Sequence, residues 1–213
     1  MDKIKRQHMK YYAQNLEDQF VHQYFGDYKG TLLEIGANSG EYLSNSLALI
    51  QAGWNAHLIE PGRTFSDLVK LHYTNPKVHL YNYAIGETES VTTFYESGAH
   101  VMGGNDSGLV SSLDFDETLR WRNAGVSFTE ATVQVKPFAD FYKEAGEPVL
   151  DFISIDAEGH DWDILQQIDL GKVGCKCLCI EWNGDTSLYN KFRDYCKGYK
   201  LAHVNRENLI FTI

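Results

Sequence analysis

The 213-residue chain lacks any run of about 18 consecutive apolar residues, the length with which a helix crosses a bilayer. It also lacks the pattern of a secretory signal, because its charged first residues, Met-Asp-Lys-Ile-Lys-Arg, are followed by no apolar segment. We therefore expect a cytoplasmic protein that does not associate with membranes.

Clusters of lysine and arginine are also missing. The chain has 19 basic and 29 acidic residues, which give a formal net charge of -10. Proteins that bind a phosphate backbone without regard to sequence present a positive face to it. The composition therefore argues against nucleic acid as a partner.

Cysteine is scarce, and three of its four residues, Cys175, Cys177 and Cys179, alternate within one short segment. On a strand, side chains two positions apart lie roughly 6.6 Å from one another, too far to share a tetrahedral zinc ion without a sharp bend. Free cysteines are among the most buried residues. We predict three reduced thiols on one buried face of a strand and a structural role for Cys196.

No internal repeat or Pro/Ser-rich linker divides the sequence, so one domain is expected over residues 1–213. Residues 1–28 form an N-terminal helical segment, with helical spacing of apolar side chains over 1–25. From Thr31 onward, short apolar segments alternate with amphipathic ones, which predicts a mostly parallel sheet covered by helices on both faces. The expected strands are 31–35, 56–59, 78–84, 149–155 and 176–182. The expected helices are 42–51, 64–72, 137–145, 161–168 and 186–196.

Two further regions depart from this alternation. Segments 199–205 and 208–213 flank a polar pair and predict a C-terminal antiparallel hairpin. Segment 91–95 predicts a short extra strand, and the Gly/Ser-rich residues 97–112 predict a mobile loop. With the helix expected over 114–123, residues 97–123 form a candidate substrate loop or lid. Its Arg120, Trp121 and Arg122 suit a sugar or an anionic acceptor, and suit an ordinary packed helix equally well.

The first strand leads into Glu34-Ile35-Gly36-Ala37-Asn38-Ser39-Gly40, and a helix follows. Gly36 and Gly40 let the chain turn sharply and let a ligand approach the backbone of Ala37 and Asn38, and the helix start supplies free N–H groups. Asn38 stands where the second glycine of a Gly-x-Gly-x-x-Gly dinucleotide motif belongs. The Gly-Lys-Ser/Thr of a P-loop is absent as well.

The next two strands also end in groups that suit an adenosine. Glu60 and Pro61 follow the second strand, where a carboxylate accepts both hydroxyls of a ribose. Tyr83 and Ala84 end the third, where they can flank an adenine. The carboxylate of Glu34 suits the amino group of a methionine moiety and repels phosphate. Together these strand ends favour S-adenosylmethionine over NAD.

The fourth strand ends at Asp156, and Glu158 and His160 follow it. A sulfonium methyl group is already a strong electrophile, so transfer requires alignment of the acceptor oxygen and removal of its proton. His160 is the natural base by its ordinary pKa, and Asp156 or Glu158 can serve if partly desolvated. Asp161 and Asp163 are expected to cap the next helix.

Several short segments carry a resemblance to a known family: 14–18 (Gln-Asn-Leu-Glu-Asp), 34–40, 45–46, 52–54, 59–61, 84–86, 111–113 and 151–161. Over nearly the whole chain they resemble the FkbM family of methyltransferases, although residue 154 is serine where that family commonly has lysine. The resemblance implies a Rossmann-like class I methyltransferase fold with a seven-stranded sheet. It also implies S-adenosylmethionine as donor and a hydroxyl acceptor, often on a sugar or a glycosylated compound.

Two alternatives to a metal-free O-methyltransferase stay open. One is another nucleotide-binding enzyme on this fold, such as an oxidoreductase or an epimerase. The other is a Mg²⁺-assisted transferase, in which Asp156, Glu181 and Asn183 resemble the metal site of catechol-type O-methyltransferases. Their oxygen atoms suit Mg²⁺, which would lower the pKa of the acceptor hydroxyl. One residue separates Glu181 from Asn183, and we favour a site without metal.

Overall fold

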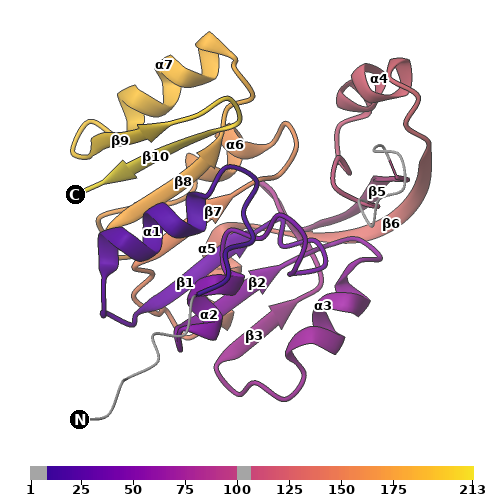
Figure 1. Ribbon diagram of the computed structural model, residues 1–213. Coiled ribbons are helices and arrows are strands. Elements are labelled where there is room, and N and C mark those ends of the chain that lie inside the picture. Colours follow the sequence, from indigo (N-terminus) through magenta and orange to yellow (C-terminus); the bar gives the residue numbers. More distant parts are fainter. Residues whose placement is uncertain (1–8, 100–106) are drawn as a thin grey trace.

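In the computed structural model, residues 9–99 and 107–213 are described. A large central sheet carries helices on both faces, and a smaller sheet with one helix lies at its side (Figure 1). Within these two ranges, no helix combines the length and apolar character that a membrane-crossing segment requires.

The central sheet has seven strands in the order β3-β2-β1-β7-β8-β10-β9. Strands β3, β2, β1, β7 and β8 run parallel, and the last two form an antiparallel hairpin whose β10 pairs with β8. This order confirms the predicted Rossmann-like fold with a C-terminal hairpin. The strands are β1 (Thr31–Ile35), β2 (Asn55–Ile59), β3 (Val78–Tyr81), β7 (Phe152–Ile155), β8 (Cys177–Glu181), β9 (Lys200–Val204) and β10 (Asn208–Thr212).

Two apolar clusters lie on the two faces of this sheet, which explains the nearly continuous apolar runs of its central strands. Leu32 and Phe152 face a cluster with α1 (Glu17–Phe25), α2 (Leu47–Gln51) and α3 (Phe65–His72). Leu33 and Ile153 face the other cluster, with α5 (Phe138–Glu144), α6 (Asp161–Leu165) and α7 (Thr186–Tyr195). The strand side chains alternate between the clusters, as the two-residue period requires.

The smaller sheet, in the order β4-β6-β5, was only partly predicted. It contains β4 (Ala84–Ile85), β5 (Ser90–Ser97) and β6 (Phe128–Lys136), with α4 (Phe115–Asn123) between β5 and β6. The expected strand 78–84 is wrong at its end, because β3 stops at Tyr81 and Ala84 pairs in the second sheet. Strand β6 was missed because most of it is exposed and polar, and within it only Val133 and Val135 are buried.

The N-terminal helix is shorter than predicted. Helix α1 begins at Glu17, residues 9–16 are not helical, and residues 1–8 lie outside the described ranges. Acidic side chains of the first helical turn hold this non-helical backbone: Asp18 accepts from the N–H of Tyr12 at 2.6 Å, and Glu17 from that of Asn15 at 2.8 Å. Local side-chain bonds of this kind compete with helix formation.

All four cysteines are free and buried, but they do not share one face. Cys177 and Cys179 belong to the cluster beneath α1 and α2. Cys175 precedes β8 and packs with Cys196 in the opposite cluster. The prediction of three thiols on one face is therefore wrong for Cys175, because the alternation begins only where the strand does.

The buried carboxylate of Asp151 joins the starts of three strands. It accepts hydrogen bonds from Thr31 N at 3.1 Å, the Tyr28 hydroxyl at 3.0 Å and Lys176 Nζ at 2.6 Å. We expect Asp151→Asn to lower the free energy of unfolding by about 2–3 kcal/mol, because bonds to a charged group are lost. Urea denaturation measures this change. The exposed Asp27→Asn is the matched control, and an equally small effect of both variants would contradict the assigned role.

Candidate active site

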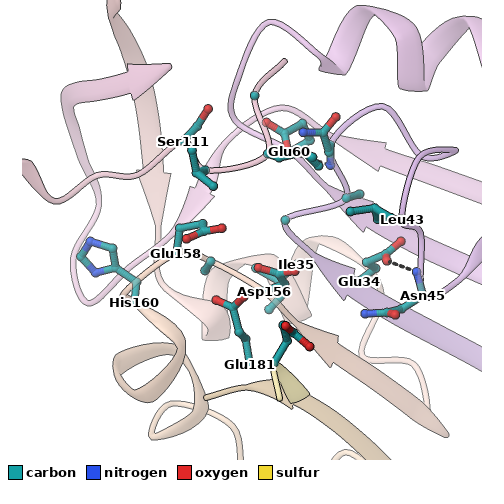
Figure 2. A pocket seen from close by; sticks show the side chains of 18 of the residues that line it. Glu34, Ile35, Leu43, Asn45, Glu60, Ser111, Asp156, Glu158, His160 and Glu181 are labelled. Atoms are coloured by element: carbon teal, nitrogen blue, oxygen red, sulfur yellow. Dashed lines mark hydrogen bonds between the residues drawn. The ribbon is translucent and has the colours of Figure 1, made fainter. Parts of the chain in front are cut away.

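A cavity of about 650 Å³ opens at the carboxyl ends of the parallel strands (Figure 2). Ligands of open α/β sheets bind at this edge, and the volume is that of a typical small-molecule site. Most of the predicted residues line it: Glu34, Gly36, Ala37, Asn38, Glu60, Pro61, Ala84, Asp156, Glu158, His160, Glu181 and Asn183.

Strand register explains why residues distant in sequence meet here. Ile35 is paired with Ile59 and Ile155, and Ile155 with Ile180. The next residue of each strand therefore lies at one level across the sheet, which places Glu60, Gly36, Asp156 and Glu181 in a row. The isoleucines that precede these residues all belong to the cluster beneath α5, α6 and α7. Because successive residues of a strand point to opposite faces, the next residues lie on the face of the sheet that α1 and α2 cover.

Gly36 allows the two central strand ends to approach closely. Its φ is +86°, and a Cβ atom built on it would lie 1.8 Å from the backbone oxygen of Asp156. The N–H groups of Gly36 and Ala37 both donate to the carbonyl of Ile59 at 3.0 Å. The first glycine of the predicted turn is therefore required by backbone contact.

Glu60 is fixed by backbone donors from two loops. Its Oε2 accepts from Asn38 N at 2.8 Å, and its Oε1 from Gly62 N at 2.7 Å. Burial raises the pKa of this carboxyl to about 6, and the two backbone bonds oppose the shift. Glu60 thus presents an oriented carboxylate to the cavity at neutral pH.

Glu34 is also buried, and the following chain supplies its partners. Its carboxylate accepts from the N–H of Asn45 at 3.1 Å and from the hydroxyl of Ser46. Burial raises the pKa of Glu34 to about 7, although the two hydrogen bonds lower it. This turn explains why α2 begins at Leu47 and not at residue 42 as predicted.

Two predicted cofactor residues do not line the cavity. Tyr83 packs in the cluster beneath α5, and its hydroxyl donates to Glu144 at 3.1 Å. Gly40 is buried against Leu68 of α3 and serves the fold of the turn. Ala84 does line the cavity, as does Phe94 of β5.

The loop wall of the cavity is held more firmly than predicted. Residues 100–106 lie outside the described ranges, but 108–111 line the cavity and are bonded to β5. Gly108 N donates to Ser97 O at 3.0 Å, and Val110 N to Ser97 Oγ at 3.2 Å. Arg63 Nη2 also donates to Ser97 O at 2.9 Å. The described part of the predicted loop is thus joined to the second sheet by hydrogen bonds.

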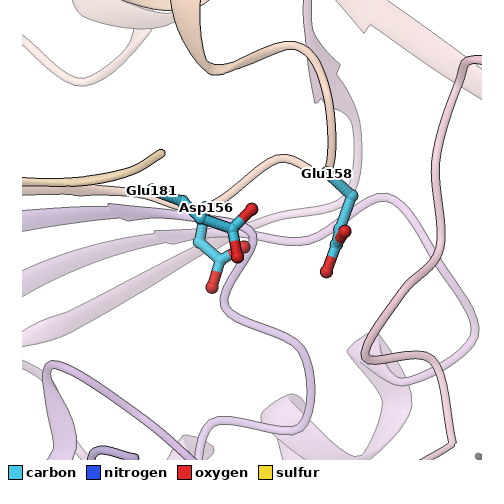
Figure 3. A group of neighbouring side chains, drawn as sticks. All are labelled: Asp156, Glu158 and Glu181. Carbon is cyan, nitrogen blue, oxygen red and sulfur yellow. The ribbon is translucent and has the colours of Figure 1, made fainter. Parts of the chain in front are cut away.

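Three carboxyl groups converge in the cavity, and we call Asp156, Glu158 and Glu181 the acidic group (Figure 3). One oxygen from each lies within 4.8 Å of the others. Burial is the main cause that raises the pKa of Asp156 to about 6, and the negative charge of Glu17 adds to it. Burial raises the pKa values of Glu158 and Glu181 well above the ordinary range, and repulsion by the nearby charge of Asp156 is the second cause. Arg120 of α4 lies 3.9 Å from Glu158 and opposes the shift there.

The loop from residue 156 to 163 differs from prediction in two respects. Asp161 does not cap α6, because its oxygens accept from Ala157 N at 3.1 Å and Gly159 N at 3.4 Å and so hold the loop. His160 lines the cavity, but its ring is turned away from Asp156 and Glu181 (Figure 2). Its Nδ1 lies 3.8 Å from Asp163.

The residues predicted for an optional metal site are only partly brought together. Asp156 and Glu181 are neighbours, but the third carboxylate beside them is Glu158. Asn183 lines the cavity in a left-handed backbone conformation, with φ of 49°, and its N–H donates to Glu207 O. The extra residue after Glu181 thus belongs to a turn and does not extend the strand.

Further cavity residues were not predicted as site residues. They come from the N-terminal segment, the turn before α2, strand β5, helix α4 and the hairpin turn: Gln14, Tyr42, Asn45, Phe94, Arg120, Trp121, Arg206 and Asn208. Asn45 lay in a segment of the family resemblance, and Arg120 and Trp121 in the candidate lid. Asn208 carried no sequence signal, because only its pairing with Glu181 brings it here.

The comparison with family models decides the class of protein. Residues 34–201 match the methyltransferase FkbM domain. The chain belongs to this family. As an FkbM methyltransferase it uses S-adenosylmethionine, so the alternative of an oxidoreductase or an epimerase is wrong. None of the curated proteins compared with it matches its sequence.

Two solved structures resemble this FkbM methyltransferase only distantly. A precorrin-6y C5,15-methyltransferase from Geobacter metallireducens is 13% identical, with a TM-score of 0.46, and the match covers 92% of this chain and 85% of that one. A protein from Staphylococcus aureus that carries the assignment caffeoyl-CoA O-methyltransferase is also 13% identical, with a TM-score of 0.46, and coverage is 93% and 81%. The methyl acceptors of these two proteins are not assigned to this chain.

Gly36→Ala tests the close approach at the centre of the site. We expect it to lower the free energy of unfolding by more than about 3 kcal/mol, because the methyl group must displace the backbone of Asp156. Gly184→Ala is the matched control: its φ is also positive, at +74°, but nothing lies within 4 Å of its Cβ position. That variant should cost only about 1–2 kcal/mol. Equal losses in urea denaturation would contradict the role given to the contact.

Proposed function

We propose that this FkbM methyltransferase transfers a methyl group from S-adenosylmethionine to a hydroxyl of a neutral, polyhydroxylated small molecule, such as a sugar or a glycosylated compound. The observation that carries this proposal is the position of the acidic group at the same level of the sheet as the donor turn Gly36–Asn38. The donor and an acceptor hydroxyl can then lie side by side in one cavity.

The donor half of the cavity suits each part of S-adenosylmethionine. Glu60 is oriented by backbone donors and would accept the two ribose hydroxyls. Ala84 and Phe94 supply an apolar wall for the adenine. Glu34 would receive the amino group of the methionine part, although its oxygens already accept from Asn45 and Ser46. Each oxygen of an ionised carboxylate has a further acceptor position, so a second bond is available.

The acceptor half is bounded by the acidic group, α4 and the hairpin turn. Three carboxyl groups there disfavour an anionic acceptor, which the sequence alone left open. Polar side chains such as Gln14 and Asn183 can bond several hydroxyls, and Trp121 supplies an aromatic surface of the kind that packs against sugar rings. We propose that residues 107–123 form the substrate side of the cavity.

The transfer itself needs alignment and the loss of one proton. The acceptor oxygen attacks the methyl carbon, the carbon–sulfur bond breaks with its electron pair going to sulfur, and S-adenosylhomocysteine forms. The hydroxyl proton passes to a base. Asp156 and Glu158 belong to the acidic group, whereas the ring of His160 is turned away from it (Figure 2). We therefore assign the proton to a carboxylate of this group rather than to His160.

A transfer assay tests the proposed acceptor class. The chain is incubated with S-adenosylmethionine labelled in its methyl group and with matched panels of sugars, other alcohols, amines and carboxylic acids. We expect label in an O-methyl ether of a neutral polyol, identified by mass spectrometry. Label found only in amines or carboxylic acids would contradict the proposal.

Asp156→Asn separates catalysis from donor binding. We expect the transfer rate to fall by about 100-fold or more, as for loss of a general base, while calorimetry shows nearly unchanged affinity for S-adenosylmethionine. Asp163→Asn is the control, because Asp163 is exposed and lies beside His160. If Asp156→Asn lost both properties together, Asp156 would belong to the donor site.

The affinity for S-adenosylmethionine should depend on pH through Glu60. Because burial raises the pKa of Glu60 to about 6, the carboxylate is ionised at neutral pH and becomes protonated as the pH falls through this value. Loss of bonds to a charged acceptor should then weaken binding by about tenfold, measured by calorimetry at several pH values. Glu60→Gln should bind weakly at neutral pH and respond less to acid. A Glu60→Gln profile identical to that of the unchanged protein would contradict the assignment.

A further inference from the structure

The oxygens of the acidic group lie at distances that suit a shared metal ion. One oxygen each from Asp156, Glu158 and Glu181 lies within 4.8 Å of the other two. Three oxygens 4.8 Å apart would each lie about 2.8 Å from a common centre, slightly beyond the roughly 2.0–2.6 Å of Mg²⁺–O and Ca²⁺–O bonds. The three carboxylates can therefore bind one divalent ion with little movement.

A cluster of carboxylates alone does not define a metal site, and Asn208 supplies an independent observation. Asn208 is only 6% exposed, and its Oδ1 is buried without a hydrogen-bond partner among the residues that the structure describes. Buried polar atoms are nearly always paired. An oxygen in this state is available to a group outside the described residues, such as a bound ion.

Strand pairing places Asn208 beside the acidic group. Asn208 of β10 is directly opposite Glu181 of β8, so both side chains leave the sheet on the same face, and both residues line the cavity. The amide of Asn208 is oriented by Glu17, whose Oε1 accepts from Nδ2 at 2.9 Å. If the amide were reversed, Asn208 Oδ1 would face Glu17 Oε1, and two acceptor oxygens cannot form a hydrogen bond. The amide nitrogen of Asn208 is therefore the atom that contacts Glu17.

We propose that Asp156, Glu158, Glu181 and Asn208 form a binding site for one divalent cation that prefers oxygen ligands, such as Mg²⁺, Mn²⁺ or Ca²⁺. Four oxygens from four side chains would hold the ion, and each carboxylate would keep its second oxygen for other bonds. The site differs from the optional set suggested by sequence, because Glu158 and Asn208 take the place of Asn183. Arg120, half exposed and 3.9 Å from Glu158, is too distant for a short ion pair.

The cation would also define how the acceptor binds, and this part rests on the proposed function. A hydroxyl bound to a divalent ion loses its proton more readily. The ion would therefore favour acceptors with a hydroxyl, or two adjacent hydroxyls, over amines that are protonated at neutral pH. The acidic group would thus select the acceptor class as well as assist proton loss.

The direct test is a titration of the full chain with Mn²⁺ after its metals have been removed with EDTA. Electron paramagnetic resonance measures the bound Mn²⁺. We expect one Mn²⁺ per chain, displaced by Mg²⁺ or Ca²⁺. Glu181→Gln should weaken binding by about 10- to 100-fold or more, at least as much as loss of a supporting group around a metal. Glu130→Gln removes the same charge from an exposed position of β6 and should leave Mn²⁺ affinity unchanged.

A second pair of variants isolates the oxygen of Asn208. Asn208→Ala removes this oxygen and one bond to Glu17. Asn15→Ala removes another bond to Glu17 Oε1, which Asn15 Nδ2 donates at 3.3 Å, without removing a bond to Asn208. Only Asn208→Ala should weaken Mn²⁺ binding. Circular dichroism confirms that each variant is folded.

Absence of Mn²⁺ binding to the unchanged chain would overturn the proposal, and so would equal affinity in folded Glu181→Gln. Calorimetry with S-adenosylmethionine on the same metal-free sample separates this result from the proposed function. Donor binding without Mn²⁺ binding would reject the cation site alone. Mn²⁺ binding without donor binding would uphold the cation site and reject the proposed donor site.

Discussion

The register of the parallel strands is the constraint on which the site depends. Pairing of Ile35 with Ile59 and Ile155, and of Ile155 with Ile180, brings the following residues to one level of the sheet. Glycine at this level in β1 lets the backbones meet, and carboxylates end the neighbouring strands. A slip of one residue in any pair would turn its carboxylate to the opposite, apolar face. The fold and the chemistry are therefore specified by the same pairing.

Carboxyl groups at this edge are buried for two different purposes. Glu34 and Glu60 accept hydrogen bonds from the loops that follow the first two strands, so the polypeptide stabilises their charge. Within the described ranges the carboxylates of the acidic group accept no such backbone bonds, and Arg120 lies 3.9 Å from Glu158. Burial of a charge without a partner is costly. In the proposed function this contrast distinguishes a donor half, whose carboxylates are already hydrogen-bonded, from an acceptor half.

Much of the donor half could be predicted because its residues follow directly from local patterns. A strand ending in Glu34 and a glycine turn, and a second strand ending in Glu60, place their groups by position alone. The place of Tyr83 outside the cavity lining was not predicted, because β3 stops at Tyr81 and the chain then crosses to a second sheet whose strand β6 has only two buried residues. The strand propensity of individual residues does not indicate where the chain leaves one sheet and enters another.

The acceptor half was less predictable because its members meet only through tertiary pairing. Glu158 joins Asp156 by a loop in which Glu158 has a positive φ of 44°, and Asn208 arrives from a hairpin strand. The spacing of Glu181 and Asn183 suggested a pair of ligands, but Asn183 lies in a turn with a positive φ of 49° and does not continue the strand. Sequence thus identified the strand ends that carry carboxylates, and the structure identified their partners.

A crystal structure with S-adenosylhomocysteine tests the central claim most directly. The account predicts ribose hydroxyls on Glu60, adenine beside Ala84 and Phe94, the amino group near Glu34 and the sulfur facing the acidic group. A ligand bound in the opposite direction, or outside this cavity, would contradict the division into donor and acceptor halves.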